Sequence, residues 1–558
     1  MSQYAPGAWL APLILVALAC ARPSSDTSAA TAASVPTPPV VVTPSTRTNP
    51  AITEGDLRTR IYIFADDSMM GRDAPLEGDR MAADYLAGEL RRLGLEPAGE
   101  NGTYFQDLPN VERGIEPGAT LQVDGTALRY GSDFLPTSLT TPRPVNGVQV
   151  VYGGVAGSDT STQITPAAAA GKFVVLAVPA SGSIRTRPAR SVSRFSKAAG
   201  VAVVNLHLIP EQNRAAIAAP VVINGMSPNE PVAEGPIALA ITPVAAEQLL
   251  GGPIDGRAPG TVGRTVSADF TLINRPLTKG TARNVVAILR GSDPALRGQY
   301  VAIGAHKDHV GYNRNPIDHD SARVVYLAEY RAQMARRAAT VQELSVNMDS
   351  LRRIRPARRD SIFNGADDDG SGSMAVLEIA EALANAPTKP ARSILFVWHT
   401  GEEDGLLGSA YYTTHPTVPR DSIIAQINID MIGRGTAQDV TGGGPDYLIV
   451  VGHRRMSQDL GSVIEAVNAR QTRPFRFDLS WDAPNHPEQI YGRSDHANYA
   501  RVGIPVAFFF TGLHADYHQI TDEPQYIDYP HYTRIVQYLN DVMLELANRK
   551  ERVRLDRE

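Results

Sequence analysis

Two adjacent glutamates, Glu402 and Glu403, closely follow a strongly apolar run at residues 393–398. The run has the length and composition of a buried strand in a parallel sheet, so both carboxylates are expected near its carboxyl end. Desolvating two neighbouring carboxylates is costly unless a cation neutralises them, and a bound metal ion does this well. The sequence therefore predicts a metal site at the end of a buried strand, and with it a metalloenzyme.

Four further segments carry side chains that bind metals, and each lies at a predicted strand end or helix start. Apolar runs at 300–305 and 427–429 predict strands, and the pattern at 370–379 predicts a helix. In an open α/β sheet, ligands bind in the crevice outside the carboxyl ends of the strands. The candidate residues in these segments are His306, Asp308, Asp368, Asp369, Asp430 and His518.

The order of the segments resembles that of a known family. The chain reads His-x-Asp from 306, Gly-Ala-Asp-Asp-x-Gly-Ser-Gly from 365, Gly-Glu-Glu-x-Gly-Leu-x-Gly-Ser from 401, Asn-x-Asp-Met-x-Gly from 428 and Tyr-His-x-x-x-Asp from 517. This succession resembles the M28 family of zinc peptidases, mostly aminopeptidases, over nearly all of residues 51–548. The resemblance implies an α/β fold class with a mixed, largely parallel central sheet flanked by helices.

The resemblance also implies a centre of two zinc ions. Asp368 would bridge the two ions, with His306 and Asp430 completing one position and Glu403 and His518 the other. Imidazole and carboxylate ligands suit zinc, and the absence of cysteine ligands argues against a closed structural site.

The remaining site residues follow from the same resemblance. Glu402 would be the general base, taking a proton from water and passing it to the leaving amine. Asp308 could accept the ring N–H of the first histidine, and Asp369 would lie beside the bridging carboxylate across a cis peptide bond. Tyr517 would either donate its phenol to the oxyanion or pack as an ordinary aromatic. The backbone carbonyl of Arg493 would contact the substrate amine.

The N-terminal segment resembles an export signal. Residues 8–19 form an apolar run too short to span a bilayer as a mature helix, and Cys20, the single cysteine, ends a lipobox-like sequence. No Lys or Arg precedes the run, and Ala17 stands where Leu is usual, so an ordinary secretory signal and an uncleaved tail remain alternatives. We expect an exported protein, either lipidated at Cys20 in the cell envelope or periplasm, or secreted.

Composition divides the rest of the chain. Residues 21–50 are rich in Pro, Thr, Ser and Ala and predict a disordered tether. The short Val-rich strands of residues 142–267 resemble the protease-associated (PA) domain inserted in many M28 enzymes. The full prediction is a signal peptide at 1–20, the tether, a first catalytic part at 51–141, the PA-like insertion, a second catalytic part at 268–548 and a charged tail at 549–558.

A second insertion is predicted at about 313–363. Apolar residues between 324 and 351 recur at threes and fours, which predicts a long amphipathic helix or helical hairpin with an arginine-rich outer face. Two interpretations are open, because such a helix can be a lid or dimerisation arm, or can simply pack on the domain surface.

The predicted function is hydrolysis of peptide bonds, with a peptide as the partner. Removal of N-terminal residues is favoured by the resemblance, and the alternatives are a zinc carboxypeptidase, a glutaminyl cyclase on the same fold, and a catalytically silent binding protein. The net charge of −6 argues against a nucleic-acid partner. Membrane association is expected only through a lipid anchor at Cys20.

Overall fold

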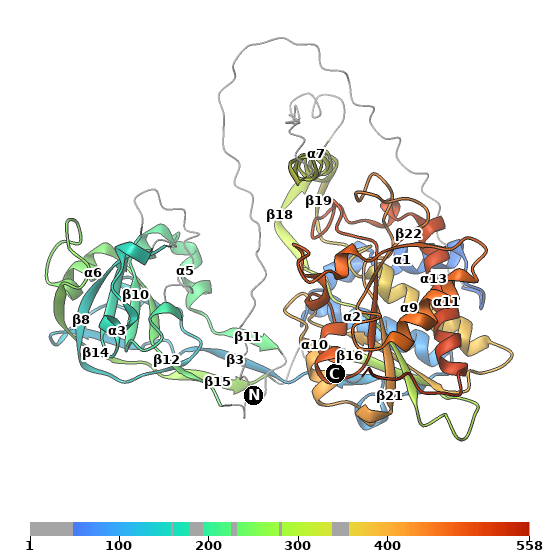
Figure 1. The fold of residues 1–558 in the computed structure, drawn as a ribbon. Coiled ribbons are helices and arrows are strands. Elements are labelled where there is room, and N and C mark those ends of the chain that lie inside the picture. The colour runs from blue at the N-terminus through green and yellow to red at the C-terminus, as the bar shows by residue number, and fades with distance from the viewer. Residues whose placement is uncertain are drawn as a thin grey trace, which may run out of the picture. The chain divides into compact units, whose positions relative to one another are not determined.

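The computed structural model describes residues 48–157, 160–178, 193–224, 231–277, 282–337 and 357–556. The chain forms two compact units, the first made of Met1–Leu108 with Gly280–Glu558 and the second of Pro109–Lys279 (Figure 1). The predicted signal peptide, Cys20 and most of the tether lie outside the described residues. Within the described residues, no helix combines the length and the apolar character that crossing a bilayer requires.

The first unit is built on one mixed sheet of nine strands. Its spatial order is β1-β16-β20-β17-β21-β24-β22-β23, with β2 also paired to β16. The four central strands, β20, β17, β21 and β24, run parallel to one another, while β16 and β22 flank them in antiparallel pairing. The strands are β1 Glu96–Pro97, β2 Phe105–Asp107, β16 Arg283–Leu289, β17 Tyr300–His306, β20 Ser393–His399, β21 Ile423–Ile429, β22 Tyr447–Val451, β23 Arg476–Asp478 and β24 Val506–Phe510.

Helices cover both faces of this sheet, because its central strands are apolar on both sides. In β20, Phe396 and Trp398 belong to the core shared with α1, α2, α9, α11 and α13, whereas Leu395 and Val397 belong to the core shared with α10 and α12. The predicted α/β class with a largely parallel centre is thereby confirmed. The helices are α1 Glu54–Phe64, α2 Glu77–Arg92, α9 Gly370–Asn385, α10 Leu407–Thr414, α11 Gln458–Ala469, α12 His496–Arg501 and α13 Tyr529–Asn548.

The second unit is β-rich and begins earlier than the predicted insertion at 142–267. An eight-stranded sheet has the order β5-β4-β14-β8-β9-β10-β13-β6, and β11, β3 and β15 form a second sheet of three strands. Residues 109–141 belong here because β3 pairs with β11 and β15, β4 with β14, and β6 with β13. The strands are β3 Asn110–Ile115, β4 Thr120–Val123, β5 Thr126–Ala127, β6 Phe134–Pro136, β7 Thr141–Pro142, β8 Val145–Val155, β9 Phe173–Ala177, β10 Gly200–Val203, β11 Val221–Asn224, β12 Glu234–Gly235, β13 Ile237–Ile241, β14 Val262–Asp269 and β15 Leu272–Pro276.

Three helices of this unit are α3 Pro166–Ala169, α5 Glu211–Ala218 and α6 Pro243–Leu250. Residues 193 and 194 are helical, and residues 195–199 form turns and bends before β10 begins. Gly200 already pairs with Phe173 and Ile237 in the sheet, so the chain must be extended there.

The predicted helical insertion is carried by a two-stranded ribbon in the first unit. Strands β18 Tyr312–Asp318 and β19 Arg359–Ile362 pair antiparallel, and helix α7, His319–Arg337, follows β18 directly (Figure 1). The predicted helical pattern continues to 351, but residues 338–356 lie outside the described part of the chain.

Candidate metal centre

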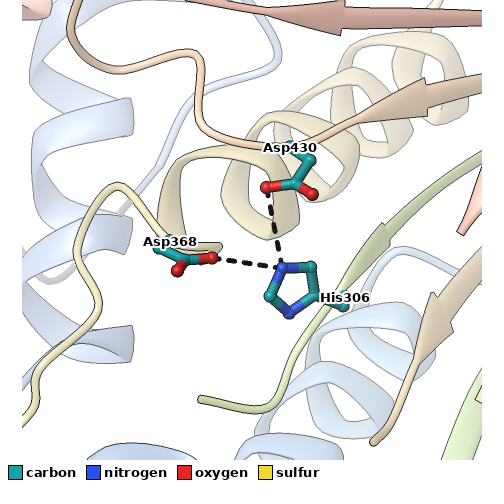
Figure 2. Close-up of side chains that lie close together, drawn as sticks. All are labelled: His306, Asp368 and Asp430. Atoms are coloured by element: carbon teal, nitrogen blue, oxygen red, sulfur yellow. Dashed lines mark ion pairs between the residues drawn. The ribbon is translucent and has the colours of Figure 1, made fainter. Parts of the chain in front are cut away.

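The first group of metal-binding side chains is assembled by two strand ends and the loop before α9. Nε2 of His306, the last residue of β17, lies 3.3 Å from Oδ1 of Asp368 and 3.6 Å from Oδ1 of Asp430 (Figure 2). All three side chains are buried. Their nitrogen and oxygen atoms are close enough to bind one metal ion together.

A second group shares Asp368 with the first. Nε2 of His518 lies 3.1 Å from Oδ2 of Asp368 and 2.9 Å from Oε2 of Glu403. The two oxygens of Asp368 therefore face two different histidines. A carboxylate in this arrangement can bridge two cations.

The donor atoms in this centre match what a metal would use. Nε2 of His306 and Oδ2 of Asp368 are buried, and neither makes a hydrogen bond within the described residues. Burial opposes ionisation of Asp368, but His306 and His518 hold the pKa of its carboxyl well below the usual range. Imidazole nitrogens with an ionised carboxylate form a ligand set that suits zinc.

Two further carboxylates, those of Asp369 and Asp522, hold the loop that carries Asp368 through hydrogen bonds to the backbone. The peptide bond between Asp368 and Asp369 is cis. Asp369 accepts hydrogen bonds from the backbone N–H groups of His306 at 3.1 Å, Met431 at 3.1 Å and Gly372 at 2.8 Å. It thereby ties the end of β17, the end of β21 and the start of α9 to one side chain.

Asp522 fixes the same loop from the other side. Its Oδ2 accepts hydrogen bonds from the backbone N–H groups of Asp367 and Asp368, both at 3.0 Å. Asp522 is the last residue of the Tyr-His-x-x-x-Asp motif, but the sequence predicted no role for it. Its distance along the chain from Asp368 hides this contact.

Asp308 lies beside His306 but contacts it differently from the prediction. Nδ1 of His306 lies 3.2 Å from the backbone carbonyl oxygen of Asp308 and 3.8 Å from the nearer carboxylate oxygen. The carboxylate instead accepts hydrogen bonds from the backbone N–H groups of Glu402 and Glu403, both at 3.3 Å. The strand end turns there, so the carbonyl faces the imidazole and the side chain faces the glutamate loop.

Glu402 lines a small pocket together with members of both metal-binding groups. Asp368, Glu403, Asp430 and His518 line this pocket with it. Burial, with the nearby carboxylates of Asp430 and Glu403, raises the pKa of Glu402 well above its usual range. A carboxylate with a raised pKa can both accept and return a proton near neutral pH.

Tyr517 and Arg493 line the same pocket. The hydroxyl of Tyr517 lies 3.4 Å from a guanidinium nitrogen of Arg493, whose other terminal nitrogen pairs with Glu488 at 2.9 Å. Burial, followed by the charges of Asp368 and Glu403, raises the pKa of Tyr517 well above its usual value. The phenol is therefore neutral at physiological pH and available as a hydrogen-bond donor.

The remaining wall of the pocket is apolar. Met431, Ile490, Phe508 and Phe510 are buried members of one hydrophobic cluster, and Leu513 packs against them. The pocket lining thus combines carboxylates and one histidine with buried apolar side chains.

Helix α7 packs against the loop that supplies this part of the pocket. The hydroxyl of Tyr330 donates a hydrogen bond to the carbonyl of Leu513 at 2.8 Å. Arg323 pairs with Asp516 at 3.4 Å, and its guanidinium lies 3.6 Å from the ring centre of Tyr526. The insertion therefore contacts the loop between β24 and His518 directly.

One buried residue of the centre was missed by sequence reasoning. His309 lies three positions after His306, and its Nδ1 is 2.8 Å from Oε1 of Glu403. The only signal was a second histidine in the sequence His-Lys-Asp-His at 306–309.

Comparison with known proteins agrees with this geometry. Residues 284–543 match the sequence model of peptidase family M28. The chain contains a peptidase family M28 domain. The matched segment includes all the predicted metal ligands, which are His306, Asp368, Glu403, Asp430 and His518.

Curated relatives match only part of their own length. The leupeptin-inactivating enzyme 1 of Streptomyces exfoliatus is 32% identical over 169 residues, which are 30% of this chain and 33% of that protein. A probable leucine aminopeptidase 2 of Aspergillus oryzae is 34% identical over 151 residues, 26% of this chain and 28% of that protein. The matched part of the M28 domain thus spans about a third of these relatives.

Solved structures of aminopeptidases are similar over a longer range. The aminopeptidase of Aneurinibacillus sp. strain AM-1 has a TM-score of 0.45 at 15% identity and covers 91% of this chain and 97% of its own. A zinc aminopeptidase from Bacillus subtilis has a TM-score of 0.45 at 16% identity, with 90% and 97% coverage.

Proposed function

We propose that this chain is an aminopeptidase that uses two zinc ions bridged by Asp368. The observation that carries the proposal is the sharing of Asp368 between His306 at 3.3 Å and His518 at 3.1 Å. His306 and Asp430 would complete one position, and Glu403 and His518 the other. Zinc held there would polarise the carbonyl of the scissile peptide and lower the pKa of a water molecule.

Glu402 is the general base of the proposed reaction. Its carboxylate takes a proton from the attacking water and delivers the same proton to the nitrogen of the departing amine. Burial and the neighbouring carboxylates raise the pKa of Glu402 well above its usual range, which supports its role in accepting this proton.

Tyr517 acts on the oxygen of the scissile carbonyl. Its neutral phenol donates a hydrogen bond to this oxygen as negative charge develops. The free amino group of the substrate is held by the carboxylates of Glu402 and Asp430 and by the backbone carbonyl of Arg493. An ammonium group suits this part of the pocket because carboxylate oxygens surround it.

The apolar wall sets the proposed substrate class. Met431, Phe508 and Phe510 are buried and packed, so they present a fixed hydrocarbon surface to the first side chain of the peptide. Burial of an apolar side chain there is favourable by about 25 cal/mol per Å² removed from water. The enzyme therefore prefers peptides that begin with a large apolar residue.

The carboxypeptidase alternative requires a cation that binds a free carboxylate. Arg493 lies in the pocket, but its guanidinium already pairs with Glu488 at 2.9 Å. This pairing favours recognition of an amine over recognition of a carboxylate.

The decisive experiment offers one leucine-initiated peptide to the full chain in three forms: free, N-acetylated and C-amidated. Products are identified by mass spectrometry, with and without a chelator and with zinc restored. Loss of the first residue that acetylation blocks, amidation tolerates and zinc restores is the expected result. Cleavage blocked by amidation would mean a carboxypeptidase. Cyclisation of an N-terminal glutamine in a parallel sample would mean a cyclase, and inertness of every sample would favour a silent binding protein.

Two further parts of the proposal concern location and accessory structure. Export, with lipidation at Cys20 or release of a secreted protein, is supported by the apolar run before Cys20. A PA-like role for the second unit is supported by its β-rich composition, and its function would be to restrict access of substrates.

A further inference from the structure

His309 is a buried histidine in contact with one ligand candidate. Its side chain is 0% exposed, and its Nδ1 lies 2.8 Å from Oε1 of Glu403. The other oxygen of the same carboxylate, Oε2, lies 2.9 Å from Nε2 of His518. Glu403 is therefore held between two imidazoles, one at each oxygen.

The surrounding backbone is shaped to hold this ring. A Cβ atom on Gly365 would lie 2.6 Å from ring atoms of His309, so only glycine leaves room for the imidazole. The buried guanidinium of Arg72 donates hydrogen bonds to the carbonyls of Gly365 at 2.8 Å and Lys307 at 3.0 Å. The backbone N–H of His309 donates to the carbonyl of Arg72 at 3.1 Å. Arg72 thus joins the segments on both sides of the ring.

The chemistry of the ring suits a donor to the carboxylate. In the tautomer that carries hydrogen on Nδ1, the ring donates to Oε1 of Glu403. A carboxylate with one oxygen held in this way keeps the other oxygen free for a cation.

We propose that His309 is a positioning residue of the second metal position, and that it orients Glu403 so that Oε2 faces the metal shared with His518. The inference rests on the proposed zinc centre. It concerns the zinc affinity of the position formed by Glu403 and His518, and not the hydrolysis of peptides. His309 lies close enough to Asp368 and Glu403 to share an ion with them, but the proposal assigns it the role of a hydrogen-bond donor to Glu403 and not that of a ligand.

The test is a zinc titration of the full metal-depleted protein in competition with a chromophoric chelator. The unaltered protein should bind two zinc ions. His309→Ala should keep one affinity unchanged and weaken the other by about 10- to 100-fold, the usual effect of removing a hydrogen-bond partner of a metal ligand.

The variant His309→Asn distinguishes a hydrogen-bond donor to Glu403 from a zinc ligand. The amide nitrogen of asparagine lies close to where Nδ1 of histidine lies, donates a hydrogen bond, and is a poor zinc ligand. His309→Asn should therefore bind the second zinc within a few-fold of the unaltered protein. Equal weakening in His309→Asn and His309→Ala would overturn the proposal and make the imidazole a ligand. Two unchanged affinities in His309→Ala would also overturn it.

A separate measurement checks that each variant folds. Circular dichroism checks each variant, and His309→Phe, which fills the volume without a nitrogen, replaces His309→Ala if the latter does not fold. His453 is the matched control because it is also buried and lies 3.3 Å from the carboxylate of Glu465. His453→Ala should retain both zinc affinities. An unaltered protein that binds zinc twice but cleaves no peptide would contradict the proposed function and leave the role of His309 intact.

Discussion

The carboxylate of Asp308 accepts a hydrogen bond from the backbone N–H of Glu402 at 3.3 Å. Its second oxygen accepts from the next N–H of the chain, also at 3.3 Å. One side chain at the end of β17 thus holds the backbone of the glutamate pair that follows β20. This relationship fixes the base and one ligand candidate relative to the histidine two residues before Asp308.

Removal of the Asp308 carboxylate should therefore misplace the glutamate loop. We expect Asp308→Ala to lower kcat by about 10- to 100-fold, because two buried N–H groups lose their acceptor and the loop shifts. Asp308→Asn keeps one oxygen acceptor, so its kcat should lie between that of Asp308→Ala and that of the unaltered protein. Steady-state kinetics on a leucine-initiated peptide measures the effect, and equal kcat values for all three proteins would contradict it.

Glu402→Gln tests the proposed base separately from the metal. The amide is nearly isosteric and cannot accept the proton, so kcat should fall by about 10²- to 10⁴-fold, while zinc content stays at the value of the unaltered protein. Kinetics and elemental analysis of the same sample give both readouts. Asp404→Asn, an exposed carboxylate in the same loop, is the control and should keep normal turnover. Normal turnover in Glu402→Gln would remove Glu402 from the mechanism.

The strands of the first unit were predictable because each is a short apolar run that ends in polar residues. β17 and β20 occupy residues 300–306 and 393–399, close to the predicted runs at 300–305 and 393–398. The start of the second unit was not predictable, since residues 109–141 form short strands. Of these, β3 pairs with β11 and β4 pairs with β14, each more than a hundred positions later in the chain. Local pattern carries no information about such pairing.

Within the site, sequence reasoning could name residues but not the atoms they use. Asp308 offers a carbonyl and a carboxylate, and only the turn of the backbone decides which of them faces His306. The contact between His309 and Glu403 joins two segments that no spacing rule relates. Residue type and strand position therefore predict membership of a site better than they predict its hydrogen bonds.

Tyr517→Phe distinguishes a donor from a packed aromatic. The ring would keep its packing beside His518, where the two ring centres are 3.9 Å apart, and only the hydroxyl would be lost. If the phenol stabilises the developing oxyanion, kcat should fall by about 10²- to 10³-fold with little change in KM. An unchanged kcat would support the packed-aromatic interpretation.

Tyr330→Phe tests whether α7 supports the pocket. The substitution removes the hydrogen bond to the carbonyl of Leu513, a contact with a net value of about 1 kcal/mol. Because Leu513 lines the apolar wall, KM for leucine-initiated peptides should rise about three- to fivefold, while kcat changes little. Tyr85→Phe, on helix α2 and outside the pocket lining, is the control and should leave KM unaltered. Equal KM values in the two variants would make α7 a helix that merely packs on the surface.

Asp439 should stabilise the fold in a pH-dependent manner. Burial alone would raise its pKa, but the guanidinium of Arg434 and hydrogen bonds from Thr436 lower the pKa of Asp439 to about 2. Arg434 donates to it at 2.6 Å and also pairs with Asp516 at 3.1 Å, the carboxylate that Arg323 of α7 contacts. Because Asp516 directly precedes Tyr517, this network includes the loop that carries Tyr517.

The sign of the effect follows from the two pKa values. The folded-state pKa of Asp439, about 2, lies below the ordinary value of 3.8, so ionised Asp439 favours the folded state. This contribution is complete above about pH 5 and disappears as pH falls through 4 toward 2. A difference of nearly two pKa units between the folded and unfolded states corresponds to about 2 kcal/mol in the free energy of unfolding at neutral pH.

Asp439→Asn should therefore lower the free energy of unfolding by about 2 kcal/mol at pH 7, with the loss shrinking between pH 5 and pH 3. Urea unfolding of both proteins at several pH values measures this difference. The exposed Asp541→Asn serves as the matched control, since it removes a carboxylate that does not contact the network, and its difference from the unaltered protein should not vary with pH. A loss at Asp439 that stays constant from pH 7 to pH 3 would mean that hydrogen-bond geometry, and not the charge of Asp439, stabilises the network around Arg434.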